Sequence, residues 1–166
     1  DPKHPDFRRG LLASVLKWTP TDEKPWLGIV GTKGSCKTRI ALMRTRVELE
    51  RFPKASFLFV PIYIYAGAVR DQYAADEKEE RSKARELLAA AMKADWLILD
   101  DVGKARNTPA VVEALFALLD HRHSYNLETI WTANSSPEEF CDGISDDVAG
   151  PLVRRLTETS ELLAVR

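Results

Sequence analysis

Short apolar segments alternate with segments of helical periodicity along most of this chain. Runs rich in β-branched and aromatic residues predict buried strands, and apolar residues spaced three and four positions apart predict helices between them. Strands are expected at 26–30, 56–65, 95–101, 128–134 and 161–165, and helices at 39–52, 71–94, 108–123 and 146–156. Because strands and helices alternate, we expect one mainly parallel sheet with helices on both faces, which is a three-layer α/β domain.

Several helix ends carry clear local signals. Thr108 is placed to cap a helix whose first position is Pro109, and Ser136 is placed to cap a short helix in the same way. The Gly-Pro pair ending at Pro151 is expected to interrupt or start the helix at 146–156, because proline cannot donate a backbone hydrogen bond.

The composition fits one folded domain and excludes some classes of protein. The 166 residues are 45% hydrophobic, and the net charge of -1 excludes a strongly basic nucleic-acid coat. No apolar run approaches the ~20 residues that span a bilayer. Two distant cysteines and the lack of an apolar leader indicate a cytoplasmic protein. Because no initiator Met is present, we expect a piece of a longer protein, with a linker and helix at 1–23 and a core at 24–166.

The run GTKGSCKT at 31–38 lies between a predicted strand and a predicted helix. It follows the phosphate-binding pattern G-x-x-x-x-G-K-[ST], except that Cys36 replaces the second glycine. In this pattern Lys37 reaches the β- and γ-phosphates of ATP, and the Thr38 hydroxyl binds Mg²⁺. The candidate nucleotide-binding residues are Gly31, Thr32, Lys33, Gly34, Ser35, Cys36, Lys37, Thr38 and Arg39. A purely structural loop is the alternative.

Polar side chains end two further predicted strands. Asp100 and Asp101 close the strand at 95–101, and Asn134 closes the strand at 128–134. Phosphoryl-transfer enzymes need one acid for Mg²⁺ and a second group to activate water, so we assign Asp100 to the metal and Asp101 to catalysis. Asn134 is a candidate for positioning the attacking water. The alternative for Asn134 is a cap on the next helix.

These motifs together resemble the bacterial helicase-loader branch of the AAA+ ATPases, which includes DnaC/DnaI-type loaders and the similar IstB-type transposition helpers. The matching segments are Asp100–Gly103, Asp120–Arg122 and Thr129–Asn134. The resemblance implies an αβα P-loop NTPase core with sheet order 5-1-4-3-2. It also implies ATP hydrolysis, assembly into a ring or spiral, and a role in DNA replication with single-stranded DNA and a replicative helicase as partners. The helicase is expected to bind an N-terminal region that this chain lacks.

The resemblance also implies an arginine that acts on the ATP of a neighbouring subunit. Arg155 occupies that place, and Arg154 replaces the acid that usually precedes it. Two solvated arginines on a helix are the alternative. The family's second sensor arginine is expected beyond Arg166, and Cys36 is expected to crowd the phosphate path and to be a reactive thiol.

Contacts to single-stranded DNA are expected from basic and aromatic side chains. The candidates are Lys104, Arg106, Tyr63, Tyr65, Arg70 and Tyr73, which could equally be core tyrosines and solvated cations. The two histidines at 121 and 123 have no partners spaced for a zinc site, so no structural metal is expected.

Three functions remain open from the sequence. The first is an ATPase that places a replicative helicase on single-stranded DNA. The second is a nucleotide-dependent adaptor with weak or no ATPase activity, and the third is a transposition helper ATPase that acts on duplex DNA.

Overall fold

The computed structural model describes residues 13, 15–74, 76–104, 108–142 and 144–165. Residues 15–17 are helical and lead into the sheet. The strands are β1 (Trp26–Gly31), β2 (Phe57–Pro61), β3 (Trp96–Val102), β4 (Glu128–Ala133) and β5 (Ser160–Val165). The helices are α2 (Lys37–Arg51), α3 (Ile62–Ala74), α4 (Lys78–Lys93), α5 (Pro109–Ser124), α6 (Pro137–Phe140) and α7 (Asp146–Thr159).

All five strands are parallel neighbours in one sheet of order β2-β3-β4-β1-β5. This confirms the predicted fold class and the order 5-1-4-3-2, read from the other edge. The strand β1 therefore lies in the interior of the sheet between β4 and β5, far from its successor β2 in the chain. The arrangement places the carboxyl ends of β3, β4 and β1 side by side at one edge, where open α/β sheets bind ligands.

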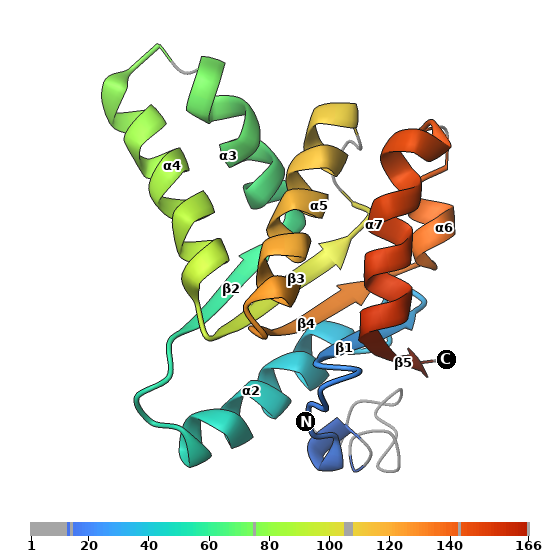
Figure 1. Ribbon diagram of the computed structural model, residues 1–166. Helices are drawn as coiled ribbons and strands as arrows, with labels where there is room; N and C mark the ends of the chain where they lie inside the picture. The colour runs from blue at the N-terminus through green and yellow to red at the C-terminus, as the bar shows by residue number, and fades with distance from the viewer. Residues whose placement is uncertain (1–12, 14, 75, 105–107, 143, 166) are drawn as a thin grey trace.

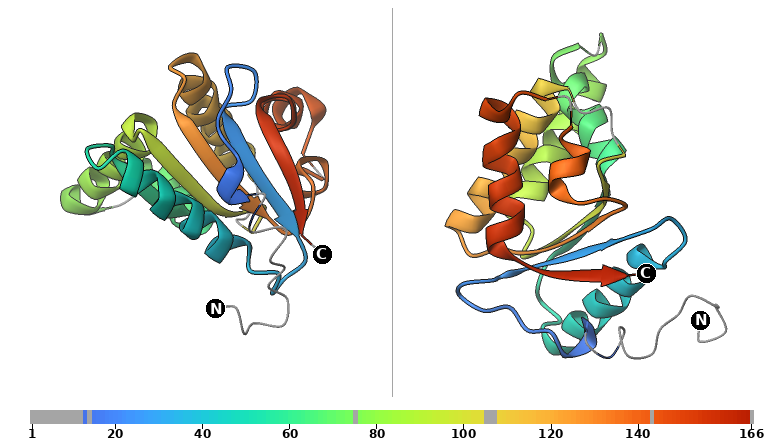
Figure 2. Two further views of the ribbon diagram at one scale, coloured as in Figure 1. Left: turned by 90° about the horizontal axis from the view of Figure 1, so that it is seen from below. Right: turned by 90° about the vertical axis from the view of Figure 1, so that its right-hand side faces the viewer.

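Helices cover both faces of the sheet (Figures 1 and 2). The helices α3, α4, α5 and α7 lie on one face, over a core that includes Leu97, Leu99, Leu118 and Trp131. The helix α2 lies on the opposite face, and its apolar residues share a second core with Leu27, Ile29 and Ile98. Val15 and Trp18, which precede β1, are buried in that second core. The division at residues 23 and 24 stays a prediction.

The expected strand at 56–65 is wrong in its second half. The strand β2 ends at Pro61, and α3 begins at Ile62. The buried residues Ile62, Tyr65, Ala66 and Val69 follow helical spacing, so one face of α3 packs onto the core. The aromatic and β-branched composition of this segment favoured a strand, but the burial of one helical face outweighs that local preference.

The single helix expected at 71–94 is in fact two helices. The helix α3 ends at Ala74, and α4 begins at Lys78 after an extended Glu77. The two helices pack against each other and extend beyond the carboxyl edge of the sheet (Figure 1). An ion pair between Glu79 and Lys83 lies on the exposed side of α4.

The caps are confirmed, whereas the expected break in the last helix is wrong. The Thr108 and Ser136 side chains accept hydrogen bonds from the third helical residue of α5 and α6. The helix α7 continues through Pro151 to Thr159. Proline removes one backbone hydrogen bond there, but Leu152 and Leu156 are fully buried on the same helix. Their burial offsets the loss and keeps the helix continuous.

Candidate functional site

The predicted nucleotide site forms where the loop after β1 meets the ends of β3 and β4. The loop leads directly into α2, so its backbone N–H groups lie at a helix N-terminus, which favours anions. A cavity of about 360 Å³ lies there. It is lined by Lys33, Gly34, Cys36, Lys37, Thr38, Arg39, Asp101, Lys104 and Asn134. The fold thus brings most of the predicted site residues together around one space.

The Lys37 ammonium is held by acceptors from the loop and from the end of β4. It donates to the carbonyl oxygens of Gly31 at 2.7 Å and Thr32 at 2.9 Å, and to Asn134 Oδ1 at 2.9 Å. Burial lowers the pKa of Lys37 below its ordinary value, because water no longer solvates the charge fully. The contact to Asn134 joins two segments that lie 97 residues apart, as the sequence motifs require.

Thr38 lines the cavity and contacts Asp100, which is buried near the end of β3. The Thr38 hydroxyl donates to Asp100 Oδ1 at 2.7 Å, and the Thr132 hydroxyl donates to the same oxygen at 2.8 Å. Magnesium prefers oxygen ligands and is commonly held by one or two carboxylates together with substrate phosphates. The hydroxyl and carboxylate oxygens of Thr38 and Asp100 therefore fit Mg²⁺, which would replace the hydrogen bond between them.

Asp101 adopts an unusual backbone conformation that turns it away from the β3–β4 ladder. Its φ is 59°, in the left-handed region that side chains other than glycine rarely adopt, and the β3–β4 register shifts between Leu99 and Val102. The Asp101 N–H donates to Thr132 Oγ1 at 2.9 Å instead of to a backbone carbonyl of the next strand. The bulge thereby separates the two carboxylates, with Asp100 on Thr38 and Asp101 toward the cavity.

The backbone conformation accounts for the glycines at positions 31 and 34 and shows that Cys36 is strained. A Cβ at Gly31 would lie 1.9 Å from the Val165 carbonyl oxygen, so β5 requires glycine at this position. Gly34 has a φ of 88°, and Cys36 has a φ of 63°, so both lie in the left-handed region. A cysteine there costs about 1 kcal/mol of backbone strain that glycine avoids. Cys36 thus occupies a position whose backbone favours the expected glycine.

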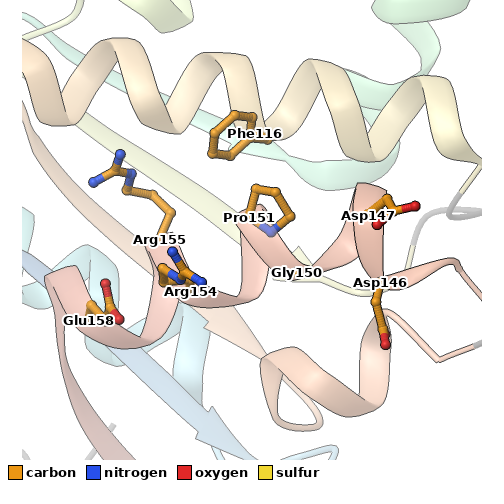
Figure 3. A pocket seen from close by; sticks show the side chains of 8 residues that line it. All are labelled: Phe116, Asp146, Asp147, Gly150, Pro151, Arg154, Arg155 and Glu158. Atoms are coloured by element: carbon orange, nitrogen blue, oxygen red, sulfur yellow. The ribbon is translucent and has the colours of Figure 1, made fainter.

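Arg155 lies on α7, outside the cavity at the loop. Its guanidinium contacts Asp120 of α5, with 2.5 Å between Nη2 and Oδ1. Arg154 and Arg155 line a second cavity of about 540 Å³ that is formed by residues of α7 and by Phe116 of α5. Figure 3 shows Pro151, Arg154 and Arg155 on α7 and Phe116 on the helix above them. That cavity contains none of the loop residues, so within one chain Arg155 is separate from the predicted phosphate site.

The DNA candidates divide between surface and core. Tyr63 is 60% exposed and Tyr73 is 80% exposed on α3, and Arg70 is exposed on the same helix. Tyr65 is buried, and its hydroxyl donates to the Ala114 carbonyl, so its predicted role as a DNA contact is wrong. Lys104 is exposed at the rim of the cavity beside the loop after β1. Arg106 lies outside the described residues.

Three functional or structural residues were missed or misassigned from the sequence. The Thr132 hydroxyl donates to Asp100 Oδ1 and accepts from the Asp101 backbone N–H. Thr132 lies two residues before Asn134, and this spacing could have revealed that both face the same side. Lys104 lies within reach of Asp101, a contact that the sequence did not indicate, and its role as a DNA contact stays a prediction. Arg122, seen only as part of a family motif, is fully buried and bonds to several backbone carbonyls.

Membrane-spanning helices and clustered metal ligands are both absent from the described residues. No helix among them has the length and apolar character needed to cross a bilayer. Within the same part of the chain, His, Cys, Asp and Glu side chains nowhere gather in groups of three that could hold a metal ion.

Comparison of the sequence with known protein families and with curated proteins finds no match. Comparison of the fold with solved structures finds similar proteins. A DnaC helicase loader is 23% identical over 95% of this chain and 86% of its own, with a TM-score of 0.65. DnaI is 19% identical over 95% of this chain and 82% of its own, with a TM-score of 0.68.

A replication initiator DnaA, solved with AMPPCP and single-stranded DNA, matches 100% of this chain with a TM-score of 0.70 and 15% identity. This chain spans 50% of that DnaA chain. The shared element is the fold, since all these identities are low. The chain therefore has the fold of an AAA+ P-loop NTPase domain, as the resemblance to helicase loaders implied.

Proposed function

We propose that this chain is an ATP-binding and ATP-hydrolysing AAA+ domain that helps to place a replicative helicase on single-stranded DNA in the cytoplasm. One observation carries the proposal. Lys37 donates to Asn134 and Thr38 donates to Asp100, so three separate segments meet in hydrogen-bond contact beside one cavity. A loop with a purely structural role has no need of a buried lysine and two strand-end polar groups at that point.

Each residue has a distinct part in this proposal. The loop from Gly31 to Ser35 cradles the phosphates through its backbone, and Lys37 binds the β- and γ-phosphates. Thr38 and Asp100 would hold Mg²⁺, which would supply Lewis-acid stabilisation of the phosphate charge. Asp101 accepts the proton of the attacking water. Asn134 positions that water while also holding Lys37 in place.

We further propose that the domain acts as an assembly. Arg155 lines a different cavity from the loop residues, so we expect it to serve the nucleotide of a neighbouring subunit. A second copy in a ring or spiral brings its terminal phosphate to Arg155, where a guanidinium stabilises transition-state charge. Asp120 holds Arg155 ready for this contact. Tyr63, Arg70 and Tyr73 offer stacking and charge for single-stranded DNA.

The proposal is tested by measuring ATP turnover with and without single-stranded DNA. We expect Mg²⁺-dependent hydrolysis that increases when single-stranded DNA is present and that duplex DNA does not increase equally. Lys37→Met is the matched control, because it removes the phosphate-binding ammonium and should abolish nucleotide binding. Hydrolysis that responds only to duplex DNA would instead support a transposition helper.

A nucleotide-dependent adaptor is the second candidate, and the left-handed backbone at Cys36 favours it. The cysteine side chain takes space beside the phosphate path where glycine leaves room. If the parent protein binds ATP without turning it over, the adaptor is the better description.

Labelling of the two cysteines with maleimide tests whether the loop at 31–38 binds ATP. Cys36 borders the cavity, whereas Cys141 is 4% exposed, and burial raises the pKa of the Cys141 thiol to about 11. We expect Cys36 to react faster than Cys141 and saturating Mg-ATP to slow the reaction at Cys36. Cys36→Gly should bind ATP more tightly than the parent. Equal rates with and without ATP, together with no gain in affinity, would contradict a phosphate-binding loop.

A further inference from the structure

Lys104 places a second ammonium in the phosphate cavity, in addition to Lys37. Its Nζ lies 2.5 Å from Asp101 Oδ2, and both residues line the cavity. Lys104 follows the end of β3 and is held near Asp101 by a turn in which the Lys104 N–H donates to the Asp101 carbonyl. Gly103, with a φ of 99°, makes this turn possible, since other residues rarely adopt that conformation.

The two ammonium groups are held very differently. Lys37 is buried, with acceptors from the loop and from Asn134 around it. The Lys104 side chain is 48% exposed. Among the described residues, its ammonium forms an ion pair with Asp101. An exposed ion pair of this kind is weak, because water screens it and the long side chain has many other conformations. Lys104 can therefore exchange its partner far more readily than Lys37.

The ion pair also affects the chemistry of Asp101. A base must accept a proton from water through an oxygen, and the Lys104 ammonium occupies Oδ2, one of the two carboxylate oxygens of Asp101. A phosphate that enters the cavity is a multiply charged anion and a stronger partner for an ammonium than one carboxylate. Because the base that activates water lies next to the terminal phosphate, Lys104 is within reach of that phosphate as well.

We propose that Lys104 is an exchangeable cation of this site. It pairs with Asp101 while the cavity contains no phosphate, and it transfers to the terminal phosphate of a bound nucleoside triphosphate, which releases Asp101 as a base. The inference rests on the proposed function, since it requires a nucleotide in this cavity. It makes hydrolysis conditional on the third phosphate and assigns Lys104 a role in telling triphosphate from diphosphate.

A carbodiimide joins a carboxylate and an amine that are already in contact, so it reports the Asp101–Lys104 pair directly. We expect the Asp101–Lys104 cross-link in the nucleotide-free protein, detected by mass spectrometry of proteolytic fragments. A non-hydrolysable ATP analogue with Mg²⁺ should reduce its yield several-fold, and ADP should reduce it much less. The pair between Glu79 and Lys83, 2.7 Å apart on α4, is the internal control and should not change. A yield that the ATP analogue leaves unchanged overturns the proposal.

Nucleotide affinity provides the second measurement. Lys104→Met should weaken ATP binding about tenfold, the size expected for one lost charge-assisted contact, and ADP binding less than about twofold. Lys104→Arg should restore the preference for ATP, which a merely structural role would not explain. Equal losses for both nucleotides, or no loss, overturn the proposal. If the parent binds neither nucleotide, the proposed function fails and this inference with it, whereas binding of both with an unchanged cross-link overturns this inference alone.

Discussion

Replacing Arg122 with methionine is expected to lower the free energy of unfolding by at least about 3 kcal/mol, the range seen when a buried charged partner is removed from its acceptors. Arg122 is fully buried at the end of the sheet opposite the phosphate cavity. Its guanidinium donates to Thr129 Oγ1 and to the carbonyl oxygens of Ala91, Ala94, Asp95 and Glu128. Methionine fills a similar space but leaves these acceptors without a donor.

Burial also lowers the pKa of Arg122 to about 10, because the charged form loses water. Five acceptors surround the guanidinium and offset this cost. Urea denaturation followed by circular dichroism measures the effect. Arg46→Met is the matched control, because Arg46 is exposed and makes one weak pair with Glu50 on the same helix, so its effect should stay within about 0.5 kcal/mol. A loss below about 1 kcal/mol for Arg122→Met would mean that water replaces the guanidinium.

Asp101→Asn is expected to reduce the turnover number for ATP about 10²- to 10⁴-fold, which is the usual contribution of a general base. ATP binding should remain, because Thr38 and Asp100 still offer their oxygens to Mg²⁺. Binding of a fluorescent ATP analogue and release of phosphate measure the two properties separately. Asp100→Asn is the matched control at the neighbouring residue, and it should weaken Mg²⁺-dependent binding of ATP as well as turnover. Unchanged hydrolysis in Asp101→Asn would move the base to another residue.

The same variant tests the role of Arg155 in an assembly. Asp101→Asn supplies Arg155 but no base, and Arg155→Ala supplies a base but no arginine. Mixing the two inactive variants should restore part of the turnover, because one kind of interface then has both groups. A mixture of Asp101→Asn with the double variant Asp101→Asn/Arg155→Ala contains no base at any interface, so it controls for general effects of mixing. If the first mixture is no more active than its components, Arg155 does not act on a neighbouring subunit.

Much of the fold could be predicted because its signals are local. Each strand is a short apolar run, each crossover helix shows its own periodicity, and the caps at Thr108 and Ser136 depend on residues three positions away. Alternating strands and helices admit few arrangements other than a parallel sheet. The start of α3 was missed because Ile62–Tyr65 has the composition of a strand, and the buried face that makes it helical depends on the helices that cover it.

The residues of the candidate site could be predicted from the sequence, whereas their contacts could not. The loop at 31–38 and the strand-end groups Asp100 and Asn134 follow from sequence, because parallel strands place their carboxyl ends at one edge of the sheet. The tertiary structure decided what the side chains do there. The left-handed φ of Asp101 comes from a bulge between β3 and β4, and the pair with Lys104 follows from that turn.

Arg122 shows the difference most clearly. From the sequence it is one basic residue near the end of an amphipathic helix, where cations are ordinarily solvated. In the fold, its guanidinium donates to the carbonyl oxygens of Ala91 and Ala94, which lie about 30 residues earlier in the chain. It also donates to the carbonyl oxygen of Glu128, which begins β4. Local periodicity determined which segments became strands and helices. Which polar groups were left in need of a partner depended on long-range packing, and no local pattern encodes that.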